Sequence, residues 1–163
     1  MPIERVVVNA SPLICLCKSG LSEIIPALFT DVIVPAAVHK EITAKEDIVR
    51  ACRILFSHQH VKIVSDITVP SSVISWDLGE GESSVLAFAL KHPEYWAVID
   101  DREARKCAST FGCRCTGTVG LIVLAKRRGI ILSAKDCLTK LQHAGLWLAQ
   151  DFVKEICLKA GEQ

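Results

Sequence analysis

Amide and carboxylate side chains follow several of the short apolar runs in this sequence. Asn9 comes directly after residues 5–8 (RVVV), and Glu41 lies in the helical segment that follows residues 31–34 (DVIV). Two further acidic pairs stand near the starts of later helical segments, namely Glu80 with Glu82 and Asp100 with Asp101. Carboxylates gathered at one edge of a sheet repel one another unless a cation neutralises them. Because the set holds oxygen donors and no His or Cys, the chemistry it predicts is binding of Mg²⁺ or Mn²⁺.

Each of these acids also has a purely structural explanation, which the sequence leaves open. Glu80 and Glu82 lie in the first turn of a predicted helix, where the helix dipole favours acidic side chains. Asp100 and Asp101 stand where the next helix needs a cap, and capping alone accounts for one of the two. Glu41 is equally consistent with an ordinary exposed helix residue. The joint occurrence of these acids at strand ends is what favours a site.

Short apolar strands alternate with helical patterns along the chain, which predicts a parallel, doubly wound α/β sheet. The predicted strands are residues 5–8, 31–34, 61–64, 96–99 and a short one at 114–116. The first predicted helix has Ser11 as its cap and Pro12 in its first position. Further helices are predicted at residues 36–43, 46–58, 80–91, 102–111, 118–129, 134–144 and 149–160. Residues 65–78 carry few periodic signals and are predicted to be a connecting loop. Ligands of such sheets bind at the carboxyl ends of the strands, where the polar residues fall.

The composition predicts a single domain over residues 1–163 with a mainly aliphatic core. Half of the residues are hydrophobic, but only three Trp, one Tyr and five Phe are aromatic. Nineteen basic residues against 18 acidic ones give a formal charge of +1, which argues against a strongly cationic nucleic-acid binder. The longest uncharged stretch, residues 6–17, is shorter than the ~20 residues of a membrane-spanning helix. We therefore expect a cytoplasmic protein with no membrane contact.

The eight cysteines do not have the spacing of a zinc site. Two pairs are C-x-C, at residues 15–17 and 113–115, and none is C-x-x-C. Most of the cysteines lie in apolar runs, where a free thiol behaves as a small buried hydrophobe. We expect reduced thiols in the core.

Five short motifs follow one another along nearly the whole chain. They are residues 8–14 (VNASPLI), 34–42 (VPAAVHKEI), 77–82 (DLGEGE), 99–105 (IDDREAR) and 117–120 (GTVG). In this order they resemble the PIN-domain family, in the subfamily that begins N/D-x-S-P-L-I and continues with D-x-G-E-x-E and I-D-D-R. Through these motifs the chain also resembles nucleases of the VapC type.

The resemblance implies a three-layer α/β/α, Rossmann-like fold with a central parallel sheet and an acidic site that uses Mg²⁺ or Mn²⁺. By position, the acids of the family fall on Asn9, Glu41, Glu82 (or Glu80) and Asp101, with Asp100 beside it. Glu41 and Asp101 would be direct ligands, whereas Glu82 and Asp100 would bind a second ion or orient water. Ser11 and Thr118 fall where the family tends to keep hydroxyl groups near the site.

The reaction implied by the resemblance is hydrolysis of RNA phosphodiesters by an endoribonuclease, as in the toxins of toxin–antitoxin pairs. A small antitoxin-like protein would then be a partner. Asn9 departs from the aspartate that the family usually has, and an amide oxygen brings no charge to a metal site. The alternative is therefore a catalytically weak or inactive PIN fold that acts as an RNA- or protein-binding regulatory module.

Basic and apolar side chains predict further contacts. Arg102 and Arg105 share a helix with the acidic site and are predicted to bind nucleic-acid phosphates. Residues 126–128 (KRR) form a second basic cluster, which the preference of helix C-termini for cations explains. Apolar residues in segments 16–25 and 146–156 exceed what a chain of this size needs to bury internally, and with the resemblance they predict a homodimer.

Overall fold

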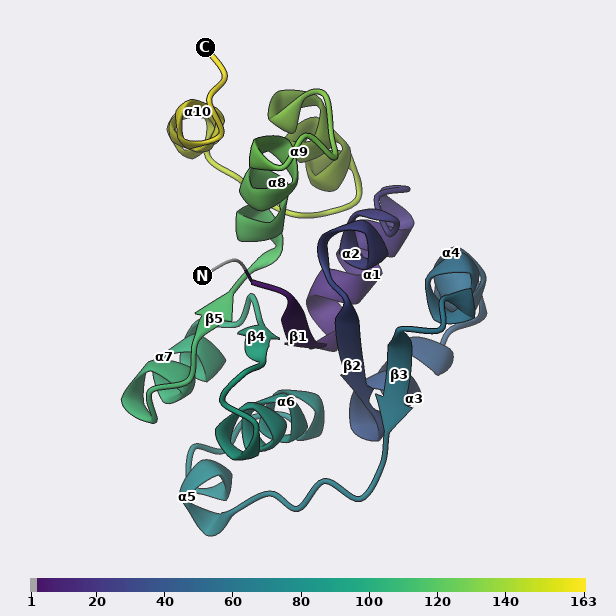
Figure 1. The fold of residues 1–163 in the computed structure, drawn as a ribbon, viewed down its shortest axis with the longest axis vertical. Coiled ribbons are helices and arrows are strands. Elements are labelled where there is room, and N and C mark those ends of the chain that lie inside the picture. The colour runs from purple at the N-terminus through teal and green to yellow at the C-terminus, as the bar shows by residue number, and fades with distance from the viewer. Residues whose placement is uncertain (1–2) are drawn as a thin grey trace.

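Five parallel strands form one sheet in the order β3-β2-β1-β4-β5. The computed structural model describes residues 3–163. Its strands are β1 (Arg5–Val8), β2 (Asp31–Pro35), β3 (Val61–Val64), β4 (Trp96–Val98) and β5 (Cys115–Thr116). The central strand β1 carries Val6, Val7 and Val8, all fully buried, because helices cover both faces of the sheet (Figure 1).

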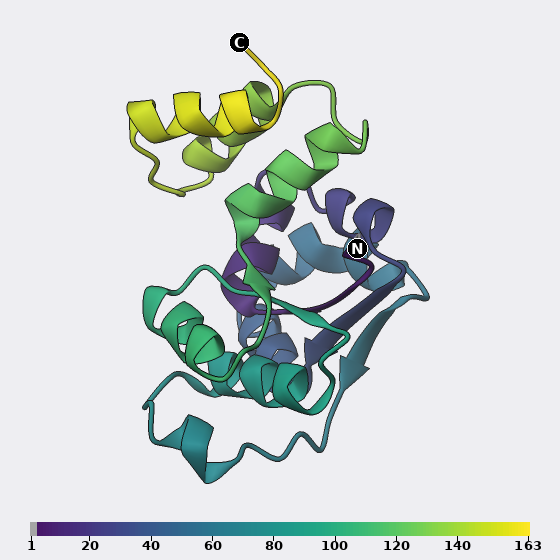
Figure 2. The same ribbon diagram turned by 60° about the vertical axis from the view of Figure 1, so that its left-hand side comes forward.

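The described residues 3–163 also form ten helices. They are α1 (Ala10–Lys18), α2 (Ile24–Leu28), α3 (Ala36–Thr43), α4 (Glu46–Ser57), α5 (Ser71–Ile74), α6 (Glu80–Lys91), α7 (Arg102–Thr110), α8 (Thr118–Arg127), α9 (Ala134–His143) and α10 (Gln150–Lys159). Helix α6 packs on β1, β2 and β4 at one face, with α7 beside it, while α1, α2, α4 and α8 lie on the other side (Figure 1). This is the three-layer α/β/α fold that the sequence predicted. Helices α9 and α10 continue beyond α8, away from the sheet (Figure 2).

The strand order reverses between β1 and β4, which are paired neighbours in the sheet. The chain leaves the sheet toward α1 after β1 and toward α7 after β4, on opposite sides. This point, where the strand order reverses, is the switch point of the sheet, and in open α/β sheets the crevice at the switch point is where ligands bind. The backbone N–H of Asn9 donates to the carbonyl of Val98 at 3.0 Å and joins these ends. The topology thus brings together chain segments about ninety residues apart.

Most elements begin and end within two residues of their predicted bounds, and the start of the first helix is an informative difference. It begins at Ala10 with Asn9 in the N-cap position, so the prediction of Ser11 as the cap was wrong. Pro12 lies in the first turn, where a helix has no internal partner for a backbone N–H and tolerates proline.

Two short helices escaped prediction because they are too short to show a period. Helix α5 lies inside the predicted loop 65–78 and is a single turn whose hydrogen bonds begin at the carbonyl of Pro70. Helix α2 has five residues, including Pro26. Within residues 3–163, no helix combines the length and the hydropathy needed to cross a membrane. All eight cysteines are free thiols. Five of them are buried, so the predicted position in the core is confirmed for those five.

Candidate metal centre at the switch point

Asn9 and Glu41 meet at the first turn of α6, over Gly81. An added Cβ on Gly81 would lie 2.6 Å from Oε1 of Glu41 and 3.2 Å from Oδ1 of Asn9. The two oxygens therefore converge on one point above this backbone, and only glycine leaves them room. The sequence analysis did not identify Gly81 as part of the site. Its position between Glu80 and Glu82 at the start of a helix was a signal that could have indicated it.

The side chain of Asn9 is buried and unsatisfied. Asn9 is 3% exposed, and its Oδ1 has no hydrogen-bond partner among residues 3–163. Although Asn9 stands in the N-cap position of α1, its side chain makes no capping bond, so helix capping does not explain it. Leaving a buried acceptor unpaired costs about 1–3 kcal/mol. A cation at this point would supply the missing partner.

The carboxylate of Glu41 lies in an unfavourable electrostatic environment. Burial raises the pKa of Glu41, and the nearby charges of Glu82 and Glu80 raise it further. The backbone N–H of Gly81 donates to this carboxylate and acts in the opposite direction. Glu80 and Glu82 at the start of α6 thus repel the carboxylate of Glu41, and a divalent ion would relieve this repulsion.

Asp100 is held in place from the other side of the crevice. The backbone N–H of Thr118 donates to its Oδ1 at 2.8 Å, and the Thr118 hydroxyl donates to its Oδ2 at 2.5 Å. Thr118 is fully buried at the start of α8, so its hydroxyl cannot easily reorient. An added Cβ on Gly117 would lie 2.6 Å from Oδ1 of Asp100 and 2.9 Å from Nη1 of Arg105. The guanidinium of Arg105 is therefore beside this carboxylate.

Cys15 connects the two halves of the crevice. It lines a cavity of about 340 Å³ together with Glu41, Ser11 and Lys18. Burial raises the pKa of the Cys15 thiol, and the charge of Asp100 raises it further. Cys15 thus borders the same cavity as Glu41, and its thiol lies within range of the charge of Asp100.

A sequence comparison decides the family. Residues 5–162 match the profile of the PIN domain, which covers almost the entire chain. The chain belongs to the PIN-domain family. No curated protein sequence matches it. The PIN domain has a nuclease-type fold, and PIN domains generally use divalent metal ions. The oxygen donors at the switch point of this PIN domain, including the unpaired Oδ1 of Asn9, fit a hard divalent cation.

The remaining predicted residues of the PIN domain are less closely gathered. Asp101 is exposed, and its Oδ2 accepts the backbone N–H of Ala104 at 2.9 Å, so it caps α7. The carboxylate of Glu82 turns back over Gly79. Within the described part of the chain, no three His, Cys, Asp or Glu side chains form a ready cage for a metal ion. The structure therefore does not bring all the predicted acids together at one point.

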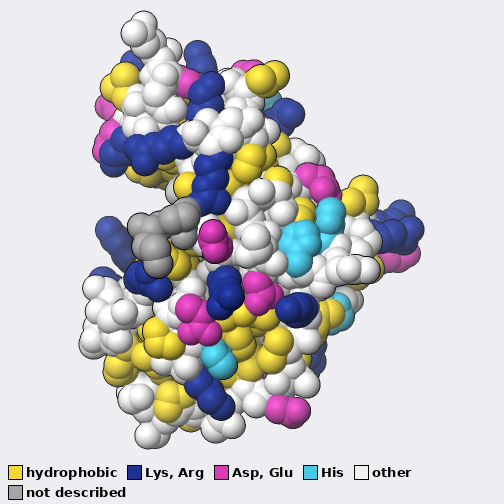
Figure 3. Space-filling view, in the orientation of Figure 1, with side chains coloured by type: hydrophobic (Ala, Val, Ile, Leu, Met, Phe, Trp, Pro, Cys, Tyr) yellow, Lys and Arg dark blue, Asp and Glu magenta, His cyan; other side chains and the backbone are white. Residues whose placement is uncertain are grey.

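The second basic cluster of the PIN domain is structural. Lys and Arg side chains are visible over the α8–α10 half of the face in Figure 3 and also over the rest of that face. Arg127 donates to the carbonyl of Lys159, Arg128 donates to the carbonyl of Leu28, and Lys126 pairs with Glu162 at 3.4 Å. These cations tie the end of α8 to α10, to α2 and to Glu162. The cluster thus has a structural role in tertiary contacts, which differs from the preference of helix C-termini for cations.

Proposed function

We propose that this PIN domain is a metal-dependent endoribonuclease that hydrolyses RNA phosphodiesters with Mg²⁺ or Mn²⁺. The observation that carries the proposal is the buried, unpartnered Oδ1 of Asn9, which faces the same point as the carboxylate of Glu41. The nuclease-type fold of the family supports the same reaction class.

In this proposal Asn9, Glu41 and Asp100 hold the ion. Glu80, Glu82 and Asp101 flank it as further negative charge, and Ser11 lies at the edge of the cavity. A bound divalent ion lowers the pKa of a water molecule and neutralises charge on the phosphate. Thr118 keeps Asp100 oriented through two hydrogen bonds. Arg102 and Arg105 bind the phosphates of the strand beside the site.

The test is RNA cleavage by the purified protein with Mn²⁺ and with EDTA. We expect cleavage with Mn²⁺ alone and its loss in Glu41→Gln and Asp100→Asn, because each removes a charged ligand. Glu155→Gln on α10 is the matched control, since Glu155 pairs with Lys159 at 2.9 Å, away from the crevice. Equal cleavage by the Glu41→Gln, Asp100→Asn double variant would refute the proposal.

A second candidate function is a regulatory module that binds RNA or protein without cleaving it. Two observations favour it: Asn9 is uncharged, and Glu82 turns away over Gly79. Calorimetric titration with Mn²⁺ separates the candidates. No Mn²⁺ binding at millimolar concentration, together with RNA binding but no cleavage, would favour the module.

We also propose a toxin-like role with a small antitoxin-like partner, and a homodimer. The exposed apolar residues Trp147, at 84%, and Leu158, at 66%, support a protein contact on the α9–α10 unit. Leu16 and Ile25, by contrast, are fully buried within their own chain, so segment 16–25 no longer supports the dimer. Light scattering over a wide concentration range tests the dimer, and a monomeric mass throughout would exclude it.

A further inference from the structure

A cleft of about 790 Å³ opens beside Asp100, between α7 and α10. Arg102, Arg105 and Lys106 of α7 line one side, and Phe152 of α10 lines the other. The volume falls in the range of about 300–1,000 Å³ that is usual for sites of small ligands. Since Asp100 also borders it, a ligand in this cleft would reach the candidate metal centre.

The cleft has more positive than negative charge among its lining side chains. Lys106 pairs with Glu103 at 3.1 Å. The side chains of Arg102 and Arg105 make no ion pair or hydrogen bond with any residue from 3 to 163, and both residues are exposed. Two guanidinium groups against the single carboxylate of Asp100 favour an anionic ligand, and guanidinium groups suit phosphate oxygens.

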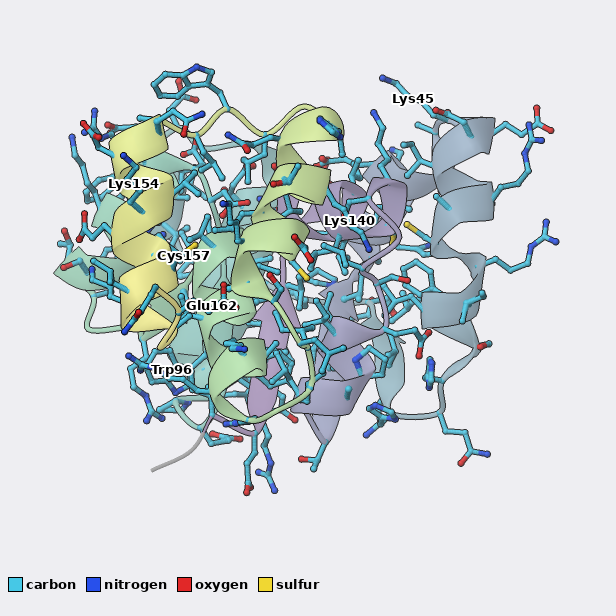
Figure 4. All side chains as sticks on the ribbon, turned by 90° about the horizontal axis from the view of Figure 1, so that it is seen from above. Lys45, Trp96, Lys140, Lys154, Cys157 and Glu162 are labelled. Carbon is cyan, nitrogen blue, oxygen red and sulfur yellow. The ribbon has the colours of Figure 1, made fainter. Side chains whose placement is uncertain are left out.

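Phe152 adds an open aromatic surface to this charged cleft. It is 39% exposed, whereas Ile156 and Cys157 on the same helix are buried. Figure 4 shows Cys157 on the side of α10 that faces α8 and α9, and α10 contacts both of these helices. The buried residues already attach α10 to the molecule. The ring of Phe152 instead borders the cleft.

Resting on the proposed ribonuclease function, we infer that Phe152 stacks on a base of the RNA substrate while Arg102 and Arg105 bind the phosphates next to it. Cationic side chains that follow a backbone, combined with an aromatic platform, are the recurring means of binding single strands. A base within a duplex is already stacked and paired, and exposing it costs a few kcal/mol. Phe152 therefore selects for an unpaired nucleotide beside the scissile phosphate.

The first experiment measures binding of a fluorescent single-stranded oligoribonucleotide and of the same sequence as a duplex, in EDTA, by anisotropy. We expect Phe152→Ala to weaken binding of the single strand about 5- to 100-fold and to leave the duplex unchanged. Phe152→Trp should retain the affinity, and Phe152→Leu, which keeps apolar bulk without a ring, should lose it. Leu158→Ala is the control, because Leu158 is 66% exposed on α10 and does not line the cleft.

The second experiment locates the stacked base. An abasic site is moved along the oligonucleotide and tested against the wild type and Phe152→Ala. At the nucleotide that contacts the ring of Phe152, the losses of binding free energy caused by the abasic site and by Phe152→Ala should not add, because each change removes one half of the same contact. Phe152→Ala should also preserve the salt dependence of binding, whereas Arg102→Ala should reduce it. Additive effects at every position, or an equal loss for single strand and duplex, would overturn the inference.

The outcomes separate this inference from the proposed function. If the wild type and Phe152→Ala cleave and bind single strands equally well, the stacking role fails and the ribonuclease stands. If neither protein cleaves with Mn²⁺ while binding still depends on Phe152, the ribonuclease fails and the single-strand site stands. No binding of RNA by the wild type would overturn the stacking role.

Discussion

Gly81→Ala tests the convergence of Asn9 and Glu41 with a single added carbon. The new Cβ would lie 2.6 Å from Oε1 of Glu41, so that carboxylate must retreat to ordinary contact distance, 3.4 Å or more. Glu41 is a flexible side chain and can do so by changing its rotamer. Asn9, at 3.2 Å, needs to shift by only a few tenths of an ångström. The substitution thus displaces one proposed ligand and leaves the fold intact.

The two expected effects have opposite signs. Replacing glycine with alanine inside a helix stabilises it by about 0.5–1 kcal/mol. For the metal, Coulomb's law with an effective dielectric of about 20 weakens the attraction by roughly 4 kcal/mol when a carboxylate moves from ~2.2 to ~3 Å from a divalent ion. A water molecule that takes the place of the displaced Glu41 oxygen would coordinate the ion and offset much of this lost attraction. We expect Mn²⁺ binding to weaken by about 1–2 kcal/mol, or roughly 5- to 30-fold in Kd.

Calorimetric titration with Mn²⁺ and thermal melts without metal measure the two effects separately. The melting temperature of Gly81→Ala should equal or exceed that of the wild type, while its Mn²⁺ affinity falls. Ser83→Ala is the matched control, since it alters the same end of α6 and adds no atoms. Wild-type affinity for Mn²⁺ in Gly81→Ala would refute the reasoning, because Glu41 would then not need its present position to bind the ion.

Asn9→Asp adds a carboxylate beside Glu41, so the metal-free variant should melt at a lower temperature than the wild type. Mn²⁺ should raise the melting temperature of the variant more than that of the wild type. Equal metal-induced increases would exclude Asn9 from a metal site. Thr118→Val removes the hydroxyl that donates to Asp100 and keeps the backbone bond, so urea unfolding should show a loss of about 1–3 kcal/mol, and an unchanged midpoint would contradict this. Tyr95 is the single tyrosine, and burial, reinforced by its hydrogen bond to Asp31, raises its pKa to about 12. The ultraviolet absorbance of the phenolate should therefore appear near pH 12 in the folded protein and near pH 10 in urea. Because the pKa of Tyr95 is higher in the folded state than in the unfolded state, the stability that Tyr95 contributes is complete below about pH 10 and is lost as the pH rises through about 12. A titration midpoint near pH 10 in the folded protein would refute this prediction. Asp31→Asn should lower the midpoint of the folded protein.

The fold was predictable because its strands have a simple local cause. Runs such as residues 5–8 are β-branched and apolar throughout, which indicates a strand buried on both faces, and Val6 to Val8 are fully buried. The strand order was not in these local patterns. It depends on which strands pair across long stretches of chain, and here β1 lies between β2 and β4.

The neighbourhood of the candidate site could also be predicted, but the role of each acid could not. The rule that ligands bind at the carboxyl ends of parallel strands drew attention to Asn9 and Asp100. Two adjacent aspartates look alike in sequence, yet one caps α7 and the other is bound by Thr118, which is 18 residues farther along. That difference arises from tertiary contacts. The close approach of α3 to α6, which gives Gly81 its importance, likewise has no local signal.

The junction of β1 and β4 also determines when in folding the candidate metal centre can form. Val6 pairs with Val32 across a short segment, whereas Val8 pairs with Val98 across most of the chain. By loop-closure entropy, the second pairing costs about 1 kcal/mol more than the first, so β1–β2 is favoured as the earlier contact. Asn9 and Asp100 become neighbours only after the longer loop closes. A partly folded chain in which only β1 and β2 are paired would therefore lack the full set of proposed ligands, and binding of a cation at this point would favour the closed β1–β4 pairing.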